Sequence, residues 1–250
     1  MKINVHAGHN PDGKISCGAV GLIKESTESR VIKDKVIQYL RKSGHTAYDC
    51  TCNNGTSQND VLRRIVDKCN SKQVDLDVSI HFNSGANDKK GNGKSTGTEV
   101  LVYSKTSKSN DEATRICSKL SAIGFKNRGV KIRTDLYFLK HTKAPALLIE
   151  VCFVDDKDDV ELYKKNIDKI AKTITEAIIN KTISASSVST EKYKVIASVL
   201  NIRKGAGTKY ATIGQVYKQG TIVEVLKLNP GKTWALTSKG WVCLQHLKKM

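Results

Sequence analysis

PALLIEVCFV, residues 145–154, is a near-continuous apolar run that a single carboxylate, Glu150, interrupts. Runs of this kind are typical of a strand that is covered on both faces. Helices cover both faces of a sheet when parallel strands are joined by crossover connections. The segment therefore predicts an α/β fold in which this strand is buried.

The sequence around this strand alternates between β-branched runs and helical patterns. Residues 3–5, 78–82 and 98–103 are strand-like. This alternation predicts a mainly parallel, twisted sheet flanked by helices over residues 1–179. Apolar residues recur at helical spacing in four segments: Ile32, Val36, Tyr39 and Leu40; Leu62, Ile65, Val66 and Cys69; Ala113, Ile116, Cys117 and Leu120; Tyr163, Ile167, Ile170, Ile174 and Ile178.

The composition changes after residue 179. Residues 180–192, NKTISASSVSTEK, hold six Ser or Thr and no regular apolar period, which indicates a flexible linker. Residues 193–250 contain short strand-like runs separated by Gly, Asn and Pro. This pattern predicts a second, small all-β domain with a barrel fold.

The net charge of +18 indicates a polyanionic partner. Residues 191–250 hold 11 Lys or Arg against 2 Glu, a net of +9, whereas residues 1–180 hold 30 basic against 22 acidic residues, a net of +8. Nucleic acid, acidic wall polymers and anionic membrane surfaces all fit such an excess. Nucleic acid is disfavoured, because the sequence lacks both a known nucleic-acid module and aromatic residues interleaved with its Lys and Arg.

No apolar run approaches the roughly 18–20 residues that a membrane span needs, so we expect no stable membrane insertion. The polar start MKINVHAGHN lacks the apolar core of a signal peptide. We therefore expect synthesis in the cytoplasm. In that compartment the seven cysteines are expected to be reduced thiols.

Three polar residues fall where open α/β sheets bind ligands, beyond the carboxyl ends of their strands. His9 follows the first predicted strand, and His81 lies near the end of the second. Glu150 lies inside an apolar strand, where a carboxylate is costly to bury unless it pairs, binds a metal or takes part in a reaction.

Two imidazoles and a carboxylate are a suitable ligand set for a catalytic zinc ion, with the fourth position left to water. Glu25, directly before a helix expected to begin near Ser26, can supply the carboxylate; Glu28 is the alternative. We favour Glu25, because a loop carboxylate can turn toward a metal while Glu28 suits the first helical turn. Glu150 is then the candidate base that takes a proton from water and returns it to the leaving nitrogen.

Several motifs together resemble the zinc N-acetylmuramoyl-L-alanine amidases, especially those of phage endolysins. The resemblance covers about residues 1–178, in the family's order and spacing. The motifs are VHAGHNPDGKISCGAVGLIKE (5–25), SIHFNS (79–84), GTEV (97–100) and the stretch from NRGVK to EVCFV (127–154).

This resemblance implies hydrolysis of the amide between N-acetylmuramic acid and L-alanine in bacterial peptidoglycan, with Zn²⁺ as cofactor. The family's metal ligands fall on His9, Glu25 and His81, and its catalytic glutamate falls on Glu150. An enzyme of the endolysin type is made in the host cytoplasm and acts on the wall after its release.

The C-terminal segment resembles bacterial SH3-like wall-binding domains over about residues 193–248, most specifically in LNIRKGAGTKY (200–210). Such domains hold wall ligands with aromatic and polar groups. Four aromatic residues are candidates for this role, and each is as well suited to a core or turn position. They are Tyr210, Tyr217, Trp234 and Trp241.

Three other functions are weighed against the amidase. A zinc peptidase that cuts within the stem peptide uses the same metal chemistry and is the nearest alternative. A catalytically inactive wall-binding protein is disfavoured by the complete set of site residues. A Cys152 nucleophile paired with His81 is a residual possibility.

The remaining polar features receive structural interpretations. His141 lies in a predicted exposed loop, which favours a structural or substrate-contacting role over metal ligation. His6, His45 and His246 are expected to be surface or structural residues. The Gly- and Lys-rich loop 85–97 is expected to be a mobile surface loop, or else a flap that contacts the substrate.

Overall fold

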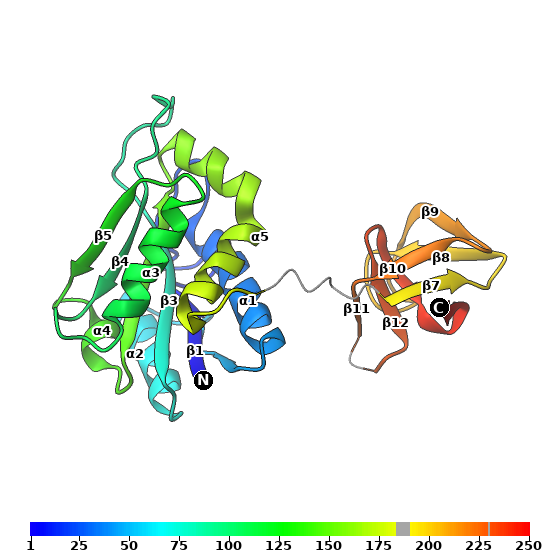
Figure 1. Ribbon diagram of the computed structural model, residues 1–250, viewed down its shortest axis with the longest axis horizontal. Helices are drawn as coiled ribbons and strands as arrows, with labels where there is room; N and C mark the ends of the chain where they lie inside the picture. The colour runs from blue at the N-terminus through cyan, green and yellow to red at the C-terminus, as the bar shows by residue number, and fades with distance from the viewer. Residues whose placement is uncertain (184–190, 230) are drawn as a thin grey trace. The chain divides into compact units, whose positions relative to one another are not determined.

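The N-terminal unit, residues 1–183, is built around a six-stranded sheet with the strand order β2-β1-β3-β6-β4-β5 (Figure 1). The computed structural model describes this unit completely, together with residues 191–229 and 231–250 of the C-terminal unit. The strands are β1 (Lys2–Ala7), β2 (Thr46–Asp49), β3 (Leu76–Asn83), β4 (Thr98–Val102), β5 (Asn127–Ile132) and β6 (Ala146–Phe153). The helices are α1 (Glu25–Lys42), α2 (Gln58–Asn70), α3 (Asn110–Ser121), α4 (Tyr137–His141) and α5 (Lys157–Ile179).

Neighbouring strands of this sheet are parallel, except for the antiparallel pair β4 and β6. The predicted mainly parallel sheet flanked by helices is thus confirmed. The sequence patterns missed β2, β5 and α4, which are short or lack an apolar period. In α2 the buried stripe begins at Val61, and Leu62, which the helical spacing favoured, is only half-buried.

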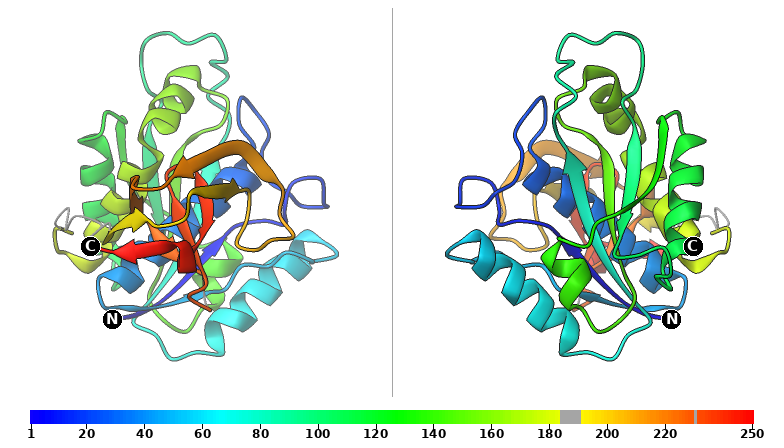
Figure 2. Two further views of the ribbon diagram at one scale, coloured as in Figure 1. Left: turned by 90° about the vertical axis from the view of Figure 1, so that its right-hand side faces the viewer. Right: turned by 90° about the vertical axis from the view of Figure 1, so that its left-hand side faces the viewer.

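The two faces of the sheet pack against different helices. Val78, Ile80 and Ile149 project into a core that also contains residues of α1, α3 and α5. Leu101 and Leu148 project to the opposite face, where they pack with residues of α2 and α4. α2 lies beside α4 (Figure 2). α4 has only 5 residues, and a pocket remains next to these two helices on their face of the sheet.

A register shift in β6 decides where its later side chains point. Glu150 lies opposite His81 of β3, but Phe153 lies opposite Asn83, so β6 contains one extra residue between these pairs. An extra residue of this kind turns the following side chains to the other face. Cys152 is accordingly fully buried in the core on the α1 and α5 side.

The loop 85–97 is held down by carboxylates of the segment that follows β6. Asp155 accepts hydrogen bonds from the backbone N–H groups of Gly85, Ala86 and Asn87. Asp158 accepts two more, from the N–H groups of Asn92 and Gly93. These bonds anchor the backbone of the loop to the segment after β6. Many of its residues are exposed, as expected of a surface loop, and its mobility stays a prediction.

The C-terminal unit consists of antiparallel strands in two sheets, with the orders β10-β7-β14 and β11-β12-β13-β8-β9. Val195, Leu200, Ile202, Ala235 and Val242 are among the residues of its core. The strands are β7 (Glu191–Val195), β8 (Val199–Arg203), β9 (Thr212–Lys218), β10 (Ile222–Val225), β11 (Lys227–Leu228), β12 (Trp234–Thr237), β13 (Gly240–Cys243) and β14 (Leu247–Lys249), with a 3₁₀ turn at Leu244–His246.

The predicted linker 180–192 falls between the end of α5 and the first strand of the C-terminal unit. Its residues 184–190 lie outside the described residues, and β7 begins at Glu191, within the predicted linker. All seven cysteines lie in the described part of the chain and carry free thiols. Among the described helices, none has the length and apolar character to cross a membrane.

Candidate active site

Three polar side chains stand in a row across neighbouring strands. Glu150 of β6 is the register partner of His81 on β3 and of Glu99 on β4. Register partners on adjacent strands project to the same face of a sheet. Because this face also carries Leu148 and Leu101, the row lies on the side of α2 and α4, at the carboxyl ends of β3 and β6.

His9 reaches the same place from the loop after β1. Its backbone has a φ of 66°, in the left-handed region that non-glycine residues seldom adopt. The preceding residue must be glycine, because a Cβ on Gly8 would lie 2.0 Å from Cε1 of His81. The absent side chain lets the His81 ring pack directly against the chain beside His9, and the two ring centroids are 4.9 Å apart.

Glu25 completes the group from the first residue of α1, one residue earlier than the expected helix start. Its side chain is buried, with Oε1 2.8 Å from Nδ1 of His81 and 3.3 Å from Nε2 of His9. Oε2 accepts a hydrogen bond from the N–H of Ala19 at 2.8 Å. A Cβ on Gly18 would lie 2.6 Å from that oxygen, so this turn also requires glycine.

The electrostatics keep Glu25 ionised inside the protein. Burial opposes its charge, but hydrogen bonds and charge attraction from His81 and His9 outweigh burial and hold the pKa of Glu25 well below its usual range. One nitrogen from each of His9 and His81 and one oxygen of Glu25 lie within 4.8 Å of one another. An anionic oxygen between two imidazole nitrogens is an arrangement that can hold a divalent metal ion.

Glu28, the alternative carboxylate, is engaged elsewhere. Its Oε2 accepts a hydrogen bond of 2.6 Å from the hydroxyl of Tyr163 on α5, a fully buried residue on the opposite face of the sheet. The structure therefore brings Glu25, and not Glu28, together with the two histidines. Cys152 is also outside this group, because it is fully buried in the core on the α1 and α5 side, where burial raises the pKa of its thiol well above the usual value.

Glu150 has the opposite electrostatic character to Glu25. Burial, followed by the negative charges of Glu25 and Glu99, raises the pKa of Glu150 well above its usual value, and Arg133 offsets only part of this. Among the described residues its Oε2 has no hydrogen-bond partner. A carboxyl group in this state is a stronger base than an ordinary glutamate.

Glu99 is a site residue that the sequence reasoning quoted in a motif but did not assign. It is buried, and its two oxygens accept hydrogen bonds from Asn83 at 2.9 Å and Arg128 at 2.8 Å. With both oxygens engaged, Glu99 acts on Glu150 through its charge. Its position in the strand-like run 98–103 predicts that it lies in the sheet, but its place beside Glu150 depends on the pairing of β4 with β6.

A pocket of about 520 Å³ opens beside these groups, and His9, His81 and Glu150 form part of its lining. Its apolar wall comes largely from α2 and from the chain at α4, with the residues Val61, Leu62, Ile65, Leu136 and Phe138.

Three further histidines of the N-terminal unit have different surroundings. His6, expected to be a surface or structural residue, is buried in the lining of the pocket. His141 is exposed at the end of α4, where its ring packs on Tyr137 with centroids 4.2 Å apart. His45 lies beside the N-terminal amine, 3.0 Å from it.

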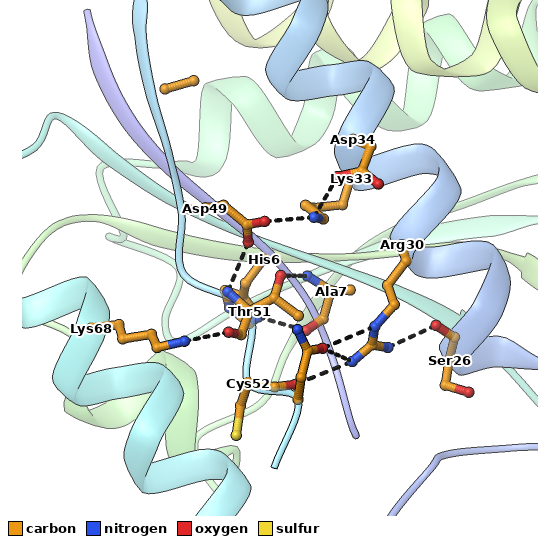
Figure 3. A network of polar contacts seen from close by, with 12 residues as sticks. His6, Ala7, Ser26, Arg30, Lys33, Asp34, Asp49, Thr51, Cys52 and Lys68 are labelled. Atoms are coloured by element: carbon orange, nitrogen blue, oxygen red, sulfur yellow. Dashed lines mark hydrogen bonds and ion pairs between the residues drawn. The ribbon is translucent and has the colours of Figure 1, made fainter. Parts of the chain in front are cut away.

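Arg30 on α1 ties the His9 loop to its surroundings. Its guanidinium donates hydrogen bonds to the carbonyl oxygens of Ser26 at 2.7 Å and Cys52 at 3.1 Å (Figure 3). It also donates to the carbonyl oxygen of His9 at 2.9 Å and to Oδ1 of Asn53 at 2.9 Å. One planar side chain thus fixes the unusual backbone of His9 relative to the helix that begins with Glu25.

The sequence model of the N-acetylmuramoyl-L-alanine amidase family matches residues 3–180. The chain belongs to this family. An endolysin of Bacillus phage SPP1 is 29% identical over 249 residues, which cover 94% of this chain and 80% of that protein. An uncharacterized protein of Clostridium perfringens is 35% identical over 241 residues, which cover 90% and 69%.

Solved structures agree with this assignment. The catalytic domain of an endolysin targeting Clostridia Difficile superposes with a TM-score of 0.65 at 34% identity, covering 74% of this chain and 99% of that domain. The chain is therefore a peptidoglycan amidase, which cleaves the amide bond between N-acetylmuramic acid and the L-alanine of the stem peptide.

The Arg30 contacts predict a measurable effect on metal affinity. Arg30→Lys keeps the charge but loses the planar fork that bonds several carbonyls at once. We expect the affinity of the amidase for a divalent metal to fall by about 10- to 100-fold, as for other groups that orient metal ligands. Competition with a chromophoric chelator measures this.

Arg41→Lys is the matched control, because Arg41 lies on the same helix and donates to the carbonyl of Ala47, away from the site. Equal metal affinity in the two variants would remove any role of Arg30 in positioning His9.

Proposed function

We propose that His9, Glu25 and His81 hold a zinc ion and that Glu150 is the general base and acid of amide hydrolysis. The observation that carries this proposal is the convergence of three ligand atoms within 4.8 Å of one another, next to a carboxyl group of raised pKa. Two imidazoles and one carboxylate are the donor set of many catalytic zinc sites. A bound zinc ion supplies a Lewis acid that polarises the scissile carbonyl and activates water at neutral pH.

The proton transfers of the reaction are carried out by the protein's own side chain, that of Glu150. Glu150 takes a proton from the attacking water as the new carbon–oxygen bond forms. When the carbon–nitrogen bond breaks, Glu150 returns this proton to the nitrogen of L-alanine, which leaves as a free amine. The raised pKa suits both steps, since a stronger base accepts the proton readily and still donates it to an amine.

We further propose that the C-terminal unit is an SH3-like module that binds the cell wall. Its all-β architecture and its net charge of +9 over residues 191–250 support this. Of the four aromatic candidates, Tyr217 is buried and its hydroxyl contacts that of Thr237, which suits a core residue. Tyr210 is exposed and packs over Gly205, so it is the better candidate for a wall contact.

In this proposal the enzyme reaches the cell wall in the way that an endolysin does. The phage protein that the chain resembles is named an endolysin. We infer that the amidase is made in the cytoplasm of a bacterial host and reaches peptidoglycan after release from the cell.

Metal removal tests the zinc proposal. The protein should bind about one zinc per chain, lose activity to a chelator and regain it with added zinc, as measured by elemental analysis and wall-lysis assays. His9→Ala and His81→Ala should lower metal content and activity together, while His45→Ala, which lies outside the site, should change neither. Full activity of metal-free protein would refute the proposal.

Glu150→Gln separates catalysis from metal binding. Metal content should stay near that of the wild type while turnover falls by about 10²–10⁴-fold, because the proton carrier is lost and the ligands remain. Glu28→Gln removes the same charge outside the site and is the control. Loss of metal from Glu150→Gln would instead make Glu150 a ligand.

The wild-type pH profile adds a second readout for Glu150. The base form exists only above the raised pKa, so activity should fall on the acidic side at higher pH than for an ordinary glutamate of pKa about 4.3.

The division of labour between the units is tested by separating them. Residues 1–183 contain every proposed site residue and should release new L-alanine amines from soluble muramoyl peptides, as mass spectrometry detects. Residues 191–250 should sediment with purified walls without cutting them. This binding should weaken with salt, since the Debye length shrinks from about 10 Å at 0.1 M to about 3 Å at 1 M. Failure of residues 191–250 to bind walls at any salt concentration would contradict this division of function between the units. Products with new ends within the stem peptide would indicate a peptidase.

A further inference from the structure

The pocket beside the proposed metal ligands has a polar floor that the hydrolysis mechanism does not use. His6 on β1 and Ser79 on β3 are register partners and line this pocket. They are 2% and 0% exposed. Both side chains therefore project to the face of the sheet that carries His81 and Glu150.

These two side chains present polar atoms that no other group satisfies. Within the described residues, neither Nε2 of His6 nor Oγ of Ser79 has a hydrogen-bond partner. Nδ1 of His6 lies 3.3 Å from the carbonyl oxygen of Ala7, and the ring packs edge-on against Phe138. Buried polar atoms without partners are costly, and a pair of them lining one pocket points to a ligand that supplies the missing bonds.

The surroundings limit the chemistry of this ligand. Val61, Leu62 and Ile65 of α2 form an apolar wall of the pocket. Burial, and next the nearby His81, lowers the pKa of His6 to about 3, so the floor is uncharged near neutral pH. An apolar wall above a buried polar floor favours a small group with one polar and one alkyl end at this place in the pocket.

We propose that His6 and Ser79 form a substrate subsite for a short uncharged amide, whose polar atoms bond to Nε2 and Oγ while its methyl group lies on the α2 wall. The inference rests on the proposed function, because two such amides flank the scissile bond of a muramoyl peptide. One is the acetamido group of the sugar, and the other is the amide that follows L-alanine.

The test compares wild type with His6→Leu and Ser79→Ala in the full-length, zinc-loaded protein. The probes are a muramoyl tripeptide, its analogue without the acetamido group, and its analogue with an N-methylated amide after alanine. Wild type should prefer the parent over one analogue by about tenfold or more in kcat/KM, which is the scale of a buried hydrogen bond. Both variants should lose most of that preference.

The analogue that the variants cleave as well as the parent substrate identifies which amide the subsite binds. If the variants equalise the parent and the analogue without the acetamido group, the subsite holds the sugar; if they equalise the parent and the N-methylated peptide, it holds the stem. Variants that keep both preferences unchanged, with or without a uniform loss of activity, would overturn the subsite and leave His6 and Ser79 a purely structural role.

Two controls keep the result interpretable. Thr175→Val removes a buried hydroxyl on α5, one that does not line the pocket, and should keep the preferences and the activity. His6→Gln retains a polar end at position 6 and should recover part of the preference if His6→Leu folds poorly.

Calorimetry of the same probes with metal-free protein measures the preference as a difference in binding, without turnover. If the metal-free protein still cleaves the parent, the proposed zinc mechanism fails, while the preference still decides on the subsite.

Discussion

The arrangement of the site depends on the burial of one ionised carboxylate, that of Glu25, between two histidine rings. A buried charge is stable only when partners satisfy it, and here the partners come from two other segments, the loop after β1 and the end of β3. His9 and His81 approach one oxygen, and the backbone N–H of Ala19 bonds to the other. The start of α1, the loop after β1 and the end of β3 are therefore held together by the carboxylate that we propose as a metal ligand.

Close approach of these segments requires positions without side chains. Gly8 and Gly18 lie where a Cβ would overlap the His81 ring and the Glu25 carboxylate. Arg30 adds a fixed link from α1 to the carbonyl of His9. The two glycines and Arg30 thus fix the positions of these segments relative to one another.

The sequence was sufficient for the mainly parallel sheet, apart from β2 and β5, and for the long helices, because apolar periods mark these elements. Strand ends and family motifs also led to the four proposed site residues, which lie near one another in the structure. The sequence could not show Glu99 and His6, whose importance depends on register. Glu99 lies beside Glu150 only because β4 pairs with β6, and His6 faces the pocket only because β1 pairs with β3 in that alignment. The anchoring of the loop 85–97 likewise depends on contacts with Asp155 and Asp158, which lie 70 and 66 residues after the backbone amides that they bind.

The direction of β4 determines which of its residues lies beside Glu150. A β4 parallel to β6 would place its carboxyl end beside Glu150, whereas the antiparallel β4 brings its first residues there, including Glu99. Asn83 and Arg128 hold both oxygens of Glu99, so this carboxylate stays in place as a neighbouring negative charge. That charge makes Glu150 harder to ionise, while Glu25 is kept ionised by its histidines. Two carboxyl groups thus acquire opposite proton affinities, one suited to binding a metal and the other to moving a proton.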